Sequence, residues 1–106
     1  MDMRVIASRT IKAYRECYPE ADGALKSWVA IIKGNDFRHF SALRRVFPSA
    51  DLIKGDVVVF NIKGNKYRLV CGVDFFRQRV FVKWFGTHKA YDKINPSEVK
   101  HVYPPC

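Results

Sequence analysis

Clustered cysteine, histidine and carboxylate residues are missing from this sequence. Its three cysteines are Cys17, Cys71 and Cys106, and its three histidines are His39, His88 and His101. Neither set shows the short spacing of a zinc or redox motif, so we expect reduced thiols and no zinc site. No cluster of carboxylates is present that would hold magnesium. We therefore expect no metal and no other cofactor.

Long apolar runs are also missing. No stretch approaches the roughly 18 apolar residues of a membrane span. Residues 1–11 carry Asp2, Arg4 and Arg9 without a sustained apolar run, so neither a signal peptide nor an anchor is expected. The Walker phosphate loop is absent, and Gly64-Asn65 is interpreted as a hairpin turn. The predicted location is the cytoplasm, with no membrane contact.

Positive charge, in contrast, is abundant. The chain has 19 Lys and Arg against 10 Asp and Glu, a formal net charge of +9. A field of this sign attracts polyanions, of which nucleic acid is the commonest in cells. The alternative is a basic protein that charge repulsion merely keeps soluble.

The length of 106 residues predicts a single domain, residues 1–106, of which residues 95–106 form a loosely ordered tail. Hydrophobic residues make up 48% of the chain, enough for a packed core. A β-prone run predicts a short strand at 3–7. Helical spacing predicts helices at 9–18, 20–33 and 36–48. Asp36 is expected to cap the third helix. His39 and the Arg44-Arg45 pair are expected on its solvated face.

The second half changes to an extended pattern. Strands are predicted at 57–62, 67–73 and 79–85, with a turn at 63–66. Helices followed by an antiparallel meander predict an α+β fold, with helices on one face of the sheet. Tyr14, Trp28 and Phe47 are expected in the core.

Two cations interrupt the apolar strands. Arg68 should share a face with Val70 and Gly72, and Lys83 should share a face with Phe81 and Phe85. If these faces coincide, two cations lie on a rigid surface suited to a phosphate in a transition state. The alternative is two ordinary solvated strand residues.

A third candidate segment follows the last predicted strand. His88 could transfer protons near neutral pH, and Tyr91 could stack on a base or hydrogen-bond to phosphate. The alternative is a turn in which Thr87 bonds to the backbone and His88 is solvated.

Two stretches, Val59 to Leu69 and Gly86 to Ile94, resemble the signature of HigB-type toxins of the RelE-like (RelE/ParE) superfamily. The resemblance extends to about Ile94. It implies a compact α+β domain with a curved antiparallel sheet and helices on one face. It also implies a toxin of a toxin–antitoxin system, an mRNA interferase that cuts messenger RNA on the ribosome without metal and so inhibits translation.

The resemblance also implies roles for individual residues. The catalytic set would be Arg68, Lys83, His88 and Tyr91, and the RNA contacts would be Lys63, Lys66, Lys89 and Lys93. It assigns no role to Trp84. The implied partners are mRNA, a cognate helix-turn-helix antitoxin, and operator DNA bound only through the antitoxin complex. The rival hypothesis is a non-catalytic RNA- or ribosome-binding module, which would not need His88 and Tyr91.

Overall fold

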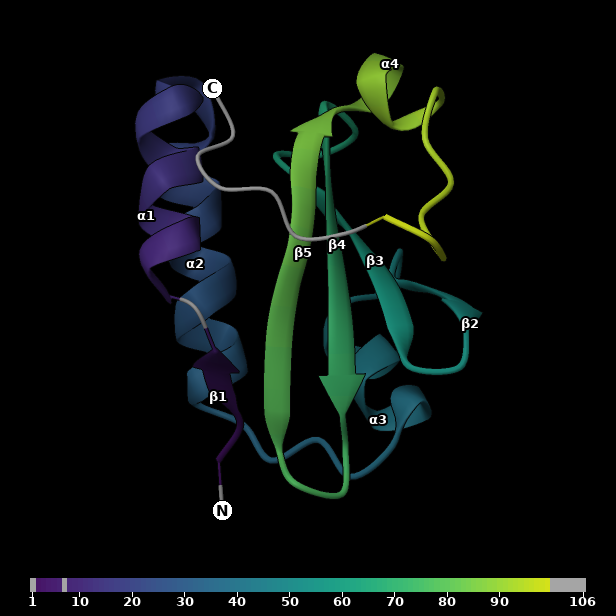
Figure 1. The fold of residues 1–106 in the computed structure, drawn as a ribbon. Coiled ribbons are helices and arrows are strands. Elements are labelled where there is room, and N and C mark those ends of the chain that lie inside the picture. The colour runs from purple at the N-terminus through teal and green to yellow at the C-terminus, as the bar shows by residue number, and fades with distance from the viewer. Residues whose placement is uncertain (1, 7, 100–106) are drawn as a thin grey trace.

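The computed structural model describes residues 2–6 and 8–99, which form one sheet and several helices (Figure 1). The helices are α1 (Ser8–Cys17), the 3-10 helix η1 (Pro19–Ala21), α2 (Asp22–Lys33), α3 (Phe40–Val46) and α4 (His88–Tyr91). The strands are β1 (Arg4–Ile6), β2 (Asp51–Lys54), β3 (Val57–Ile62), β4 (Tyr67–Asp74) and β5 (Arg79–Thr87). Within these residues, no helix is long and apolar enough to cross a membrane.

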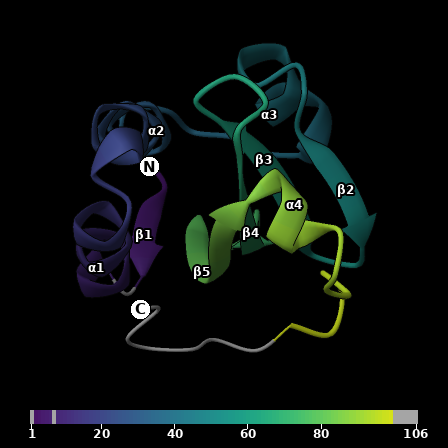
Figure 2. The same ribbon diagram turned by 90° about the horizontal axis from the view of Figure 1, so that it is seen from above.

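The sheet has five strands in the order β1-β5-β4-β3-β2. Strands β2 to β5 form an antiparallel meander, whereas β1 pairs with β5 in parallel. The α+β prediction is confirmed. The sheet is mixed because β1 pairs with β5 in parallel, while the other strands pair antiparallel. Figure 2 shows α4 and the chain that follows it on the opposite side of β4 from α2 and α3.

The main core lies between the helices and one face of the sheet. The apolar stripe of α2 is buried, and the Trp28 ring packs edge-on against Phe60 of β3, with centroids 5.4 Å apart. From α1, Tyr14 packs against Phe85 of β5, also at 5.4 Å. Each large apolar side chain buried in this way contributes about 1.5–3 kcal/mol to folding. The core predictions for Tyr14 and Trp28 are confirmed, and Phe47 packs partly buried against the same core.

The third helix is shorter than predicted. It begins at Phe40, and its N-cap is His39, whose Nδ1 accepts a hydrogen bond from the Ala42 amide at 3.3 Å. The prediction of Asp36 as the cap is therefore wrong, whereas His39 is exposed, as predicted, but lies at the N-cap of the helix. Phe37 is buried in the preceding loop, so its apolar character reflects core packing outside the helix. The edge strand β2 was not predicted because its residues are mostly exposed and lack a clear alternation.

The expectation of three reduced thiols is wrong for Cys17, which is disulfide-bonded. Sequence spacing could not predict this, because a disulfide joins residues that are near in space and distant along the chain. Cys71 is a free, fully buried thiol, and burial raises its pKa. Cys106 lies outside the described residues.

Candidate functional site

The face of the sheet opposite the helices carries a small apolar cluster of its own. Its buried members are Val57, Val59 and Val70, and the side chains that cover them are Ile53, Trp84, Tyr91 and Val99. This face is therefore partly covered by α4 and the segment after it. The apolar contact holds Tyr91 against the sheet.

A β-bulge decides which β5 side chains reach this face. Val70 pairs with Trp84 and Cys71 with Val82, so Lys83 is the extra residue. The Trp84 indole extends over Gly86: a Cβ added at Gly86 would lie only 2.7 Å from the indole Cη2. Glycine is thus required where the indole crosses the strand.

Arg68 reaches this face near the β3–β4 turn. Its Nη2 donates to Asn65 Oδ1 at 2.7 Å, and its Nη1 donates to the Tyr67 carbonyl at 3.2 Å. Its guanidinium carbon lies 5.9 Å from the centroid of the Tyr91 ring. These contacts orient a half-buried cation without neutralising it, since none of these partners is a carboxylate.

Helix α4 starts at the same end of the sheet and brings Tyr91 against this arginine. Thr87 caps the helix by accepting from the Ala90 amide at 3.1 Å, which confirms the predicted turn. The His88 amide donates to the Lys66 carbonyl at 2.9 Å and ties α4 to the β3–β4 turn. Because Gly86 is the register partner of Arg68, α4 begins at the Arg68 end of β5.

The titratable groups of α4 have distinct surroundings. The partly exposed His88 ring has its Nε2 3.7 Å from Asp92 Oδ1. Tyr91 lies between several charges, and its pKa is raised, first by burial and then by the negative charge of Asp51. The Tyr91 phenol is consequently protonated at neutral pH and can act as a hydrogen-bond donor.

The predicted RNA-binding lysines fall into two groups. Lys63 and Lys66 donate to Glu20 Oε1 at 3.0 and 3.1 Å, and these hydrogen bonds, that from Lys63 first, lower the pKa of Glu20 to about 2. Lys89 and Lys93, on α4 and just after it, are exposed. Two of the four lysines therefore already hold a carboxylate, and the other two face solvent.

Lys83 does not join Arg68. A Cβ added at Gly72 would lie 3.1 Å from Lys83 Cε and 3.7 Å from Asp56 Oδ2, so the lysine lies over Gly72. Gly72 and Arg68 share a face of β4, as predicted, but four residues separate them, about 13 Å along the strand. The structure thus brings Arg68, His88 and Tyr91 to one end of the sheet and places Lys83 farther down.

Sequence reasoning missed three residues of this site. Asp92 follows His88 by four positions, and this helical spacing could have revealed the pair. Asn65 had been interpreted only as a turn residue, and Trp84 had no assigned role. The ring centroids of Trp84 and Tyr91 lie 6.2 Å apart. The β-bulge creates this arrangement, and no local sequence pattern predicts that bulge.

Within residues 2–6 and 8–99, no three His, Cys, Asp or Glu side chains group as metal ligands.

Comparison with known proteins defines the class of this α+β domain. Residues 21–94 match the model of the HigB toxin family, the RelE-like toxic component of a toxin–antitoxin system. The matched segment includes α2, α3, the meander and α4. The chain therefore belongs to the HigB toxin family.

Curated relatives agree with this assignment. The chain is 34% identical over 92 residues to the mRNA interferase toxin HigB of Escherichia coli K12, covering 85% of this chain and 88% of the relative. It is 31% identical over 94 residues to the mRNA interferase HigB of Escherichia coli O6:H1, covering 87% and 91%. The similarity thus extends over most of both chains.

Proposed function

We propose that this toxin is an endoribonuclease that cleaves messenger RNA. The observation that carries the proposal is the meeting of Arg68, His88 and Tyr91 at one end of the sheet, where β4 supplies the cation and α4 the other two groups. The relatives named mRNA interferases support the same substrate.

The proposed reaction is attack by a ribose 2′-oxygen on the adjacent phosphorus. The new P–O bond forms a 2′,3′-cyclic phosphate, and the bond to the 5′-oxygen of the next nucleotide breaks. His88 is the proton-transfer group: it takes the proton of the 2′-hydroxyl, and its protonated form returns a proton to the leaving 5′-oxygen. Arg68 stabilises the negative charge that grows on the phosphate oxygens. No step requires a metal.

The aromatic residues position the RNA. The Tyr91 phenol, which like any tyrosine is protonated at neutral pH, donates a hydrogen bond to a phosphate oxygen. Trp84, with its ring 6.2 Å from Tyr91, offers a stacking surface for a base next to the cut. Lys89 and Lys93 contact neighbouring phosphates, and Lys83, about 13 Å along β4 from Arg68, contacts one farther along the strand. Lys63 and Lys66 contact RNA once it displaces Glu20.

The same proposal places the protein in its biological setting. The toxin acts in the cytoplasm on mRNA held by the ribosome and thereby stops translation. A separately encoded helix-turn-helix antitoxin neutralises it, and the pair represses its own operon by binding operator DNA through the antitoxin.

The test is cleavage of a short RNA by the purified protein, with and without EDTA and with and without ribosomes. The proposal predicts products ending in 2′,3′-cyclic phosphate and 5′-hydroxyl, undiminished by EDTA and increased when the RNA is ribosome-bound. His88→Ala should bind RNA without cutting it. Intact RNA that the wild type still binds in a salt-dependent manner would support the rival hypothesis, a non-catalytic binding module.

A further inference from the structure

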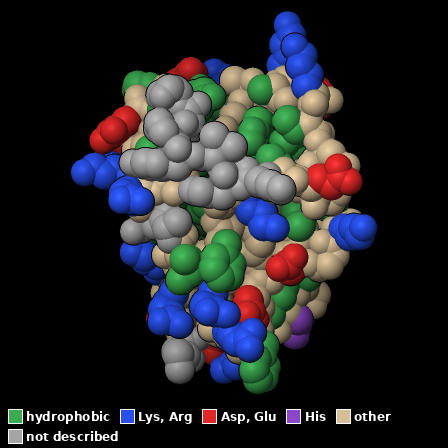
Figure 3. All heavy atoms as spheres, viewed as in Figure 1, with side chains coloured by type: hydrophobic (Ala, Val, Ile, Leu, Met, Phe, Trp, Pro, Cys, Tyr) green, Lys and Arg blue, Asp and Glu red, His purple; other side chains and the backbone are tan. Residues whose placement is uncertain are grey.

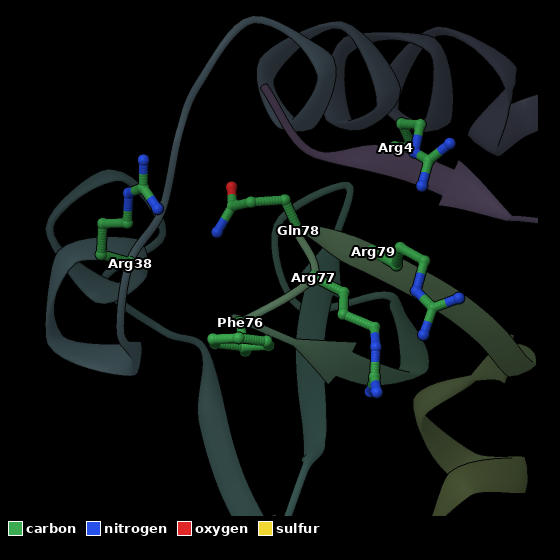
Figure 4. Close-up of a pocket in the computed structure, with 6 residues that line it drawn as sticks. All are labelled: Arg4, Arg38, Phe76, Arg77, Gln78 and Arg79. Atoms are coloured by element: carbon green, nitrogen blue, oxygen red, sulfur yellow. The ribbon is translucent and has the colours of Figure 1, made fainter. Parts of the chain in front are cut away.

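A second basic site lies at the opposite end of the sheet, around the β4–β5 turn. A hollow of about 390 Å³ there is lined by Arg4, Arg38, Phe76, Arg77, Gln78 and Arg79 (Figure 4). In the space-filling view, Lys and Arg side chains gather in the lower part of the molecule (Figure 3). The proposed catalytic residues are remote from this hollow, since the eight residues of β4 separate the two ends by about 25 Å.

Four arginines from separate parts of the chain line this hollow. Arg4 of β1 and Arg79 of β5 are register partners, and the Arg4 amide donates to the Gln78 carbonyl at 2.9 Å. Arg77 comes from the turn itself, and Arg38 comes from the loop before α3. Adjacent like charges on paired strands repel each other.

The nearby carboxylates only partly neutralise these arginines. Asp74 accepts from both Arg77 and Arg79 at 3.3 Å, and Asp36 pairs with Arg38 at 2.9 Å. Among the described residues, no carboxylate lines the hollow itself. Two carboxylates thus face four guanidinium groups, and a net positive charge is left in the hollow.

The hollow also contains polar atoms without partners. Gln78 is only 3% exposed and adopts a φ of 55°, in the left-handed region. Its Nε2 donates to the carbonyls of Phe37 and Phe75, each at 2.7 Å, but its Oε1 has no donor. The buried Nε of Arg79 likewise has no acceptor. Such unpaired buried polar atoms are rare in folded proteins.

Phe76 supplies the apolar part of the site. Its side chain is 89% exposed at the tip of the turn. A single exposed aromatic ring among arginines offers a stacking face for a nucleobase, with cations placed for the flanking phosphates. A protein partner would be expected to need a wider apolar surface, because interface cores are apolar and depleted of charge.

We propose that this hollow is a second binding site for single-stranded RNA, in which the arginines hold phosphates and Phe76 stacks on a base. The identity of the ligand as RNA rests on the proposed nuclease function. A transcript long enough to reach both ends of the β4–β5 hairpin would bind the catalytic end and this site together. A short RNA would occupy the catalytic end alone during cleavage.

The experiment measures fluorescence anisotropy of a non-cleavable 2′-O-methyl RNA of about sixteen nucleotides with the full chain. Arg38→Ala/Arg77→Ala removes two charges whose side chains are 65% exposed, so folding should be retained. Each phosphate contact contributes about 0.7 to the magnitude of the slope of log affinity against log salt concentration. The loss of two contacts should therefore reduce that slope by about 1.4. Phe76→Ala should weaken binding about five-fold or more. The matched control is Lys12→Ala/Lys26→Ala, which removes two exposed charges from α1 and α2 and should leave the slope unchanged.

A second measurement separates this proposal from the nuclease proposal. The catalytic efficiency on a cleavable RNA of about four nucleotides should be equal in wild type and in Arg38→Ala/Arg77→Ala. If the wild type cuts no RNA but the long-RNA slope still falls, the nuclease proposal is wrong and this site stands. If the arginine variant binds long RNA as the lysine control does, the site is wrong. Loss of antitoxin co-purification without loss of RNA affinity would also overturn it, by assigning the surface to a protein partner.

Discussion

The guanidinium carbon of Arg68 lies 5.9 Å from the ring centroid of Tyr91, although the two residues belong to different elements. The pairing of β4 with β5 places the start of α4 beside Arg68, and the apolar cluster under Tyr91 holds the phenol there. The sheet thus positions the Arg68 cation, and the single turn of α4 positions His88 and Tyr91.

Replacement of Arg68 should abolish most of the cleavage without unfolding the protein. Arg68→Ala should lower the catalytic efficiency about 10²- to 10³-fold, the usual cost of removing one preorganised stabiliser of transition-state charge. Arg68→Lys should recover only part of it, because an ammonium cannot reproduce the contacts of the guanidinium fork with Asn65 and Tyr67. Single-turnover cleavage of a short RNA measures the effect of both substitutions. Equal rates for Arg68→Ala and wild type would remove Arg68 from the site.

Removal of the His88 ring should lower the rate of cleavage about 10²- to 10⁴-fold, the range of general acid–base catalysis. His39→Ala is the matched control: it deletes the same side chain at the N-cap of α3, and should cost about 0.5–2 kcal/mol of stability but no activity. Single-turnover rates and urea unfolding of both variants make the comparison. A His88→Ala variant as active as His39→Ala would contradict the assigned proton transfer.

A methyl group at Gly86 should disturb the site from within the sheet. Gly86→Ala would place a Cβ 2.7 Å from the Trp84 indole. The indole must then shift, at a cost of about 1–3 kcal/mol in the free energy of unfolding, and Tyr91 should shift with it because the two rings pack together. Cleavage should fall as well. In Trp84→Phe/Gly86→Ala the smaller ring should restore much of the stability, and a double variant no more stable than Gly86→Ala would refute this steric explanation.

The Glu20 contacts should make stability depend on pH in the acid range. Hydrogen bonds from Lys63 and then Lys66 lower the pKa of Glu20 from 4.5 to about 2 in the folded protein. Because the folded-state pKa is the lower one, this stabilisation is complete above pH 4.5 and is lost as the pH falls to about 2. Urea unfolding of wild type and Glu20→Gln should therefore differ most near neutral pH and converge in acid. A difference that stays constant from neutral pH to pH 2 would contradict the ion pairs.

Local patterns were enough to predict most of the elements. The strand at 57–62 matches β3 in full, and the predicted hairpin and the strand starting at Arg79 agree with β4 and β5. β-Branched runs and a turn rich in Gly and Asn signal extended structure without help from distant residues. The start of α3 could not be predicted in this way, because Phe37 is apolar for burial in a loop and His39 is an uncommon cap.

Within the site, sequence alternation left open whether Arg68 and Lys83 share a face, and its placement of Phe85 on the face of Lys83 is wrong, because Phe85 is buried in the main core. The bulge at Lys83 and the lysine's position over Gly72 depend on how β4 and β5 pair. The same pairing placed Trp84 beside Tyr91, which the spacing along the chain does not show. The pairing of Lys63 and Lys66 with Glu20 joins residues more than forty positions apart. Such contacts follow from the fold and not from a local pattern.

The most direct test of the nuclease proposal is induction of this chain alone in a bacterium, with mapping of new 5′ ends on abundant transcripts. The account predicts growth arrest and discrete new ends within translated regions, both lost in Arg68→Ala and in His88→Ala and retained in His39→Ala. Intact transcripts in cells that make folded toxin, with or without growth arrest, would contradict it.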